Sequence, residues 1–152
     1  MDKLFFTREI ETCADRMYRI AYTLLHCNAD CEDALQEAVL KAWEKRETLR
    51  DHQRFAAWLT RILINECRNV QRKRRRMVPL DSLPESAASP PDPDLSFALQ
   101  ALPERFRLPL MLQYAEGFSH QEIAGMLRLP PSTVRGRIAR AKLQLRKELE
   151  AQ

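Results

Sequence analysis

Prolines are concentrated in one short stretch of this chain. Five of the nine prolines lie within residues 79–94, and the same stretch contains no lysine or arginine. Proline lacks an amide donor and has a fixed φ, so a run rich in proline forms a semi-extended linker rather than part of a core. The sequence therefore predicts two modules, residues 1–78 and 95–152, joined by a flexible linker at 79–94.

Charge differs among these three parts. The 152 residues carry 25 basic and 21 acidic side chains, a net charge of +4. Residues 1–78 have 16 basic and 12 acidic groups, and residues 95–152 have 9 and 5, so each module carries +4. The linker carries four acidic groups and a net charge of −4. Two basic modules thus flank an acidic linker.

The sequence argues against a membrane or secreted protein. It has no apolar run of about 18 residues, which a membrane-spanning helix needs. Charged residues follow Met1 at once, so we expect no signal peptide. The four cysteines, in a chain without a secretory signal, predict reduced thiols and a cytoplasmic location.

Few residues offer enzyme or metal chemistry. The three glycines are too scattered for a phosphate-binding loop, and no Ser–His–Asp set or paired carboxylates stand out, so we expect a protein that is not an enzyme. Cys27 and Cys31, with His26 beside them, raise the alternative of a metal or redox site. A structural zinc site needs four ligands, and His52 and Cys67 are distant in sequence. We therefore expect no metal and no cofactor.

Helical spacing of apolar residues predicts an all-α fold, because strand signals are hard to find. The first module is predicted to hold three helices. The first is capped by Thr7 and ends near Asn28, and the second is capped by Asp30. The third begins near Phe55 and continues into the basic run at 72–76.

The second module is predicted to begin with a short helix near residues 95–102. A further helix starts at Pro103 and is interrupted at Pro109, which lacks an amide donor. Gly117 suits a left-handed position after a helix. Ser119 and Glu122 then form a capping box, which marks the start of the next helix.

The segment from Ser119 to Lys147 has the layout of a helix-turn-helix: a short helix, a turn at Arg128 that favours positive φ, and a final helix from about Ser132. We expect His120, in the capping box, to be exposed. The apolar face of the final helix is predicted to comprise Val134, Ile138, Ala141, Leu145 and Leu149. The opposite face is basic with small residues between the cations: Arg135, Gly136, Ala139, Arg140, Arg146 and Lys147. Such a face can enter a DNA major groove, and the alternative is a solvated helix that only packs on its neighbour.

The third helix of the first module combines aromatic, amide and basic side chains. They are Trp58, Arg61, Asn65, Arg68 and Asn69, followed by the basic run at 72–76. Rings that stack on bases and cations that follow phosphates suit single-stranded nucleic acid. The alternatives are that Trp58 and Phe55 are core residues and that the basic run binds polyanions without specificity.

The second helix carries a polar, acidic face. Its members are Glu32, Asp33, Gln36 and Glu37. The alternative is that this face is only a solvated surface, whose acidic side chains stabilise the N-terminus of the helix.

Two sets of motifs, in order, resemble bacterial RNA polymerase sigma factors. The segments that resemble region two are DALQE at 33–37, KAW at 41–43, FAAWLTRI at 55–62 and Asn65. Region four is resembled by LPERFR at 102–107, EGFS at 116–119, EIA at 122–124, STVRGRI at 132–138 and RA at 140–141. Only a short linker separates them, which is typical of the extracytoplasmic-function (group IV) subfamily. The resemblance covers roughly residues 10–77 and 95–150.

The resemblance implies a role for each surface. The acidic face of Glu32, Asp33, Gln36 and Glu37 would dock on the β′ clamp helices of core RNA polymerase, and the β flap is a further expected contact. Asn65 would capture a base flipped from the −10 element of promoter DNA, with Leu49 at the rim of that pocket. The final helix would read the −35 element as duplex through Arg135, Gly136, Ala139 and Arg140, with Arg137 and Lys142 near phosphates. The family also implies an anti-sigma partner.

Two other functions fit parts of the sequence. One is a helix-turn-helix regulator that binds duplex DNA without polymerase and whose first module binds another partner. The other is a helical adaptor whose basic faces meet an acidic protein. A steep loss of affinity with salt separates DNA binding from the adaptor. The first module combines an acidic helix with a helix that carries Asn, Arg and aromatic side chains. This combination argues against both the regulator and the adaptor.

Overall fold

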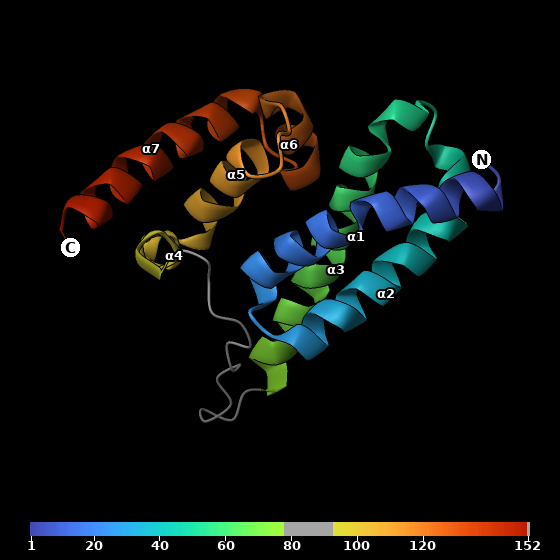
Figure 1. Cartoon of the computed structure of the whole chain (residues 1–152), viewed down its shortest axis with the longest axis horizontal. Helices are drawn as coiled ribbons and strands as arrows, with labels where there is room; N and C mark the ends of the chain where they lie inside the picture. The colour runs from blue at the N-terminus through green and yellow to red at the C-terminus, as the bar shows by residue number, and fades with distance from the viewer. Residues whose placement is uncertain (78–92, 152) are drawn as a thin grey trace. The chain divides into compact units, whose positions relative to one another are not determined.

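The computed structural model describes residues 1–77 and 93–151, which form two compact helical units (Figure 1). Every regular element within these two ranges is helical, as the apolar spacing predicts. Most of the predicted linker, residues 79–92, lies outside the described residues. Its last two residues, Pro93 and Asp94, belong instead to the first turn of a helix, because proline is well tolerated where helix amides have no partner anyway.

The first unit packs three long helices against one another. In chain order its elements are α1 (Lys3–Leu25), α2 (Asn28–Glu44), the short 3₁₀ turns η1 (Arg46–Thr48) and η2 (His52–Arg54), and α3 (Phe55–Met77). Each long helix contacts the other two. Their shared core includes Leu25, Phe55 and Leu63, each at most 1% exposed. Burial of such side chains contributes about 1.5–3 kcal/mol each.

Both predicted N-caps in this unit are wrong. Asp2, not Thr7, caps α1, and its carboxylate accepts a 2.8 Å hydrogen bond from the amide of Phe5. Thr7 lies inside the helix and donates its hydroxyl hydrogen to the Lys3 carbonyl. Asp30 lies in the first turn of α2, after the N-cap Cys27, and its carboxylate instead binds Arg74 on α3. The Asp30 side chain therefore forms an ion pair with Arg74 instead of the predicted N-cap hydrogen bond.

The second unit contains α4 (Pro93–Ala101), α5 (Glu104–Tyr114), α6 (His120–Leu127) and α7 (Pro131–Glu150). The long α7 contacts all three shorter helices. Leu112, Ile123 and Val134, which come from α5, α6 and α7, are fully buried at the centre of this unit. The succession of α6, a short turn and α7 is the helix-turn-helix that the sequence predicts.

Most local signals in this unit are confirmed, and one is wrong. Gly117 has φ of 78° after α5, and Arg128 has φ of 57° at the end of α6. Ser119 and Glu122 form both hydrogen bonds of the capping box, at 3.0 and 3.1 Å. However, α5 continues through Pro109 instead of being interrupted. Pro109 is itself fully buried, and its burial offsets the loss of one backbone hydrogen bond.

Candidate functional sites

The final helix, α7, separates an apolar face from a basic one. Val134, Ile138 and Ala141 are at most 3% exposed and hold the helix on its unit. The residues predicted to read bases are all exposed, and they are Arg135, Gly136, Ala139 and Arg140. A Cβ added at Gly136 would meet no heavy atom within 4 Å, so this face is open along its length. The helix can therefore present two arginines and two small residues to a groove.

The two flanking cations of α7 have different surroundings. Arg137 is half-buried, and an arginine can bury its aliphatic part while its guanidinium remains in water. The Lys142 ammonium lies 4.6 Å from the centroid of the Tyr114 ring on α5. This cation–π contact draws Lys142 toward α5.

The turn before α7 is fixed by backbone geometry. Arg128 adopts the left-handed conformation, and the next amide, that of Leu129, donates to the Ala124 carbonyl at 3.0 Å. Ala124 is small and buried, which permits close packing of α6. These contacts set the angle at which α7 leaves α6. The α6–turn–α7 unit is thus a rigid support for the basic face.

His120 differs from its expectation. Its side chain is half-buried, and its Nε2 lies 2.8 Å from Nε2 of Gln113 on α5. The sequence showed only its place in the capping box, which left its side-chain partner undefined.

The α3 residues that are predicted to bind a single DNA strand differ in exposure and in their hydrogen bonds. Arg61 is exposed, and Trp58, Asn65, Arg68 and Asn69 are half-buried. Arg68 donates to the Gln71 side chain at 3.0 Å, and Asn69 accepts from Arg72. Asn65 makes no side-chain hydrogen bond within residues 1–77 and 93–151, so its amide can donate to and accept from a ligand.

The structure changes the roles predicted for Trp58 and Leu49. Trp58 packs 5.6 Å from the Phe55 ring, which makes it partly a core residue as well as a candidate stacking surface. Leu49, predicted at the rim of a base pocket, is only 9% exposed. It follows η1 in a stretch whose neighbours Arg50 and Asp51 are exposed, so burial of this one apolar side chain anchors the loop. Its side chain offers little surface to a base.

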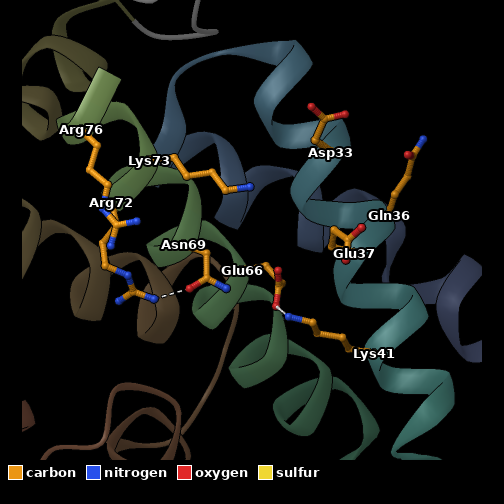
Figure 2. Close-up of a pocket in the computed structure, with 9 residues that line it drawn as sticks. All are labelled: Asp33, Gln36, Glu37, Lys41, Glu66, Asn69, Arg72, Lys73 and Arg76. Carbon is orange, nitrogen blue, oxygen red and sulfur yellow. Dashed lines mark hydrogen bonds and ion pairs between the residues drawn. The ribbon is translucent and has the colours of Figure 1, made fainter. Parts of the chain in front are cut away.

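The four predicted docking residues of α2, Glu32, Asp33, Gln36 and Glu37, are all exposed. Three of them, Asp33, Gln36 and Glu37, line a groove of about 590 Å³ between α2 and α3. Figure 2 shows these side chains on one helix and a row of basic side chains on the other. The lining side chains on α3 are Glu66, Asn69, Arg72, Lys73 and Arg76, and Lys41 of α2 also lines the groove.

Two ion pairs between α2 and α3 were not predicted from the sequence. Lys41 pairs with Glu66, whose side chain is 9% exposed, and this hydrogen bond raises the pKa of the Lys41 ammonium above its usual value. Arg74 pairs with Asp30, with Nε 2.9 Å from the carboxylate. The sequence did contain a signal for the Lys41–Glu66 pair. Glu66 is a charged residue that lies one turn beyond Ile62 and Leu63, within the apolar stripe of α3.

The cysteines form no disulfide. Cys13, Cys31 and Cys67 are buried and Cys27 is half-buried, and none of these thiols is oxidised to a disulfide. Burial raises the pKa of the Cys31 thiol to about 11, so it is an unreactive group at neutral pH. No cluster of three or more metal-ligating side chains occurs within residues 1–77 and 93–151. In the same two ranges, none of the helices combines the length and apolar character required to cross a membrane.

Comparison with known proteins supports the interpretation of both units. The family Sigma-70 region 2 matches residues 10–77, and Sigma-70, region 4 matches residues 94–145. The RNA polymerase sigma-E factor of Streptomyces coelicolor is 32% identical over 155 residues, with 97% of this chain and 88% of that protein covered. The ECF RNA polymerase sigma factor SigE of Mycolicibacterium smegmatis is 35% identical, with 88% of this chain covered.

The chain spans 57% of the length of that SigE and 40% of the probable sigma factor RfaY of Xanthomonas campestris. Among solved structures, the sigma factor RpoE in complex with the anti-sigma factor NepR from Bartonella quintana superposes with a TM-score of 0.80. That match has 28% identity and covers 95% of this chain and 96% of the other. Both regions thus occur in the same order as in these relatives, and the chain belongs to the extracytoplasmic-function (ECF) sigma factors of RNA polymerase.

Proposed function

We propose that this protein is an alternative sigma factor, which binds core RNA polymerase and directs it to particular promoters. The observation that carries the proposal is the presence, in one chain, of an open basic helix on a helix-turn-helix and an exposed acidic face beside a candidate strand-binding helix. Its activity is binding rather than bond chemistry. The separation of DNA strands is stabilised because unstacked bases are held on the protein.

The decisive experiment is transcription in vitro with core polymerase and a library of promoters. Addition of the protein is expected to select a subset of promoters that share two sequence elements. Core polymerase that gains no selectivity would contradict the proposal. Sequence-specific duplex binding by the protein alone would then favour a helix-turn-helix regulator that works without polymerase.

In this proposal α7 reads the −35 element as duplex DNA. Arginine side chains pair with guanine edges in the major groove, and the small residues Gly136 and Ala139 allow the helix to approach the bases. Arg137 contacts the phosphate backbone. The support is the exposure of this face together with the rigid turn at Arg128.

The −10 element is read as melted strand by α3. Asn65 lies one helical turn beyond Arg61 and one before Asn69, so the three side chains share a face. The free amide of Asn65 recognises the polar edge of a flipped base, with Trp58 and Arg68 beside it. Leu49 is left out of this contact because its side chain is buried.

Asn65→Ala is expected to impair open-complex formation more than initial duplex binding. Alanine removes the amide without altering the core, so stability should change little. On a pre-melted bubble promoter the defect should persist and should depend on the identity of the unpaired base. A variant with unchanged preference among base-substituted bubbles would remove Asn65 from the site.

Core polymerase docks on the acidic face of α2. Asp33→Lys or Glu37→Lys should weaken binding to core polymerase while the fold survives, because both side chains are exposed. Glu11→Lys, an equal charge change on an exposed position of α1, is the matched control and should bind normally. Normal binding of the α2 variants combined with early melting would show that the acidic face is structural.

An anti-sigma factor is the proposed regulator, as in the complex of RpoE with NepR. The second unit has an almost entirely apolar groove of about 530 Å³ that suits a partner helix or the β flap. Its lining residues are Leu99, Leu110, Met111, Tyr114, Ala115, Lys142 and Leu145. A bound anti-sigma factor would compete with core polymerase for this protein.

A further inference from the structure

The groove between α2 and α3 has two walls of opposite charge. Asp33 and Glu37 project from the α2 wall, and Lys73 and Arg76 project from the α3 wall (Figure 2). At one end, Lys41 reaches from α2 to Glu66 on α3 and closes the groove with an ion pair. This pair links the two walls at that end of the groove.

Away from that end, the charged side chains that line the groove on α2 and α3 form no ion pair with one another. Within residues 1–77 and 93–151, Asp33, Lys73 and Arg76 take part in no ion pair, although they line one space. Glu37 forms no ion pair across the groove, and its charge acts on Lys41 of its own helix, whose pKa it helps to raise. Arg72 is held by Asn69 on its own helix. The groove, of about 590 Å³, keeps the opposite charges apart. Both walls are thus available to a molecule that enters between them.

The charge pattern distinguishes between two kinds of occupant. A phosphate placed at Lys73 or Arg76 would also face the carboxylates of Asp33 and Glu37, and like charges within the Debye length of about 8 Å repel. A protein segment can present basic side chains on one side and acidic ones on the other, so that both walls gain favourable contacts. The groove therefore favours a protein over a nucleic acid.

We infer that the whole α2–α3 groove, and not the α2 face alone, binds core polymerase, through a polymerase segment that turns basic side chains to α2 and acidic side chains to α3. Lys73 and Arg76 are then polymerase contacts rather than phosphate contacts, which divides the basic run at 72–76 by function. Arg74 of the same run is already tied to Asp30. This inference rests on the proposed function, because it extends the docking surface assigned there.

The test is the double charge reversal Lys73→Glu/Arg76→Glu. In a titration of fluorescently labelled protein with core polymerase, we expect at least about a tenfold loss of affinity, which corresponds to about 1.4 kcal/mol. The matched control is Lys3→Glu/Arg8→Glu, which makes the same charge change at exposed positions of α1 and should bind as the wild type does. The milder Lys73→Gln/Arg76→Gln variant should show a smaller loss, and circular dichroism verifies that each variant is folded.

A second measurement uses holoenzyme assembled at saturating core polymerase. Its affinity for promoter DNA should be little changed by Lys73→Glu/Arg76→Glu. If folded variants bind core polymerase normally and the assembled holoenzyme loses DNA affinity, the α3 wall is a DNA surface and the inference is wrong. Normal core binding by Asp33→Lys as well would instead overturn the proposed docking face itself, so the two failures can be told apart.

Discussion

The helices α3 and α7 are both long and basic, but the protein uses them differently. Eight side chains of the 23-residue α3 are buried, whereas only three of the 20-residue α7 are. Some cations of α3 bind groups of their own unit, as Arg74 binds Asp30. On α7, Arg135 and Arg140 form no ion pair within the described ranges. A basic sequence alone does not define a DNA surface, because packing decides which cations remain available.

The largest expected effect tests the buried character of α3. Leu63 is 0% exposed, so Leu63→Ala should destabilise the first unit by about 2–5 kcal/mol through lost burial and a cavity. Residue-resolved hydrogen exchange should show faster opening of α1–α3 and unchanged protection in α4–α7, because each unit has its own core. Leu40→Ala, at a position that is 58% exposed, is the control and should have little effect. Equal loss of protection in both units would show that they unfold together.

A smaller effect tests the availability of the α7 cations. Arg140→Ala should relax discrimination at one base pair of the −35 element by about 1–3 kcal/mol, the range for an arginine paired to a base. Arg137→Ala should weaken binding to all sequences about equally and reduce the salt slope by about one unit. Binding isotherms on single-base variants at several salt concentrations measure both effects. Uniform weakening by Arg140→Ala would instead assign Arg140 to the phosphates.

The smallest effect separates stability from function on α7. Gly136 lies within the helix and a Cβ there meets nothing within 4 Å, so Gly136→Ala should stabilise the second unit by about 0.5–1 kcal/mol. The same change should lower affinity for −35 duplex DNA, because the added methyl group enters the space that the bases occupy. Gly125→Ala on α6 is matched in exposure and free space and should give the same stabilisation without the loss of affinity. Equal DNA affinity for both variants would place Gly136 away from the duplex.

Local chemistry made much of the fold predictable from the sequence. The capping box runs only from Ser119 to Glu122, four residues, and the left-handed positions at Gly117 and Arg128 follow directly from helix ends. The two faces of α7 follow from a repeat of 3.6 residues per turn. The residues predicted to read bases on α7 and the acidic residues of α2 therefore lie on the surface, as the periodicity predicts, and Arg137 is half-buried.

Tertiary structure decided what spacing along the chain could not. Lys41 and Glu66 are 25 residues apart, and Asp30 and Arg74 are 44 residues apart, so their pairing depends on how α2 and α3 come together. The same packing places Asp30 against Arg74 instead of in its predicted N-cap role, and it buries Leu49. Long charged side chains can reach several neighbours, and the sequence does not specify which neighbours are within reach. By itself the sequence determined the helices and their faces, whereas packing determined which charges are paired and which face the groove.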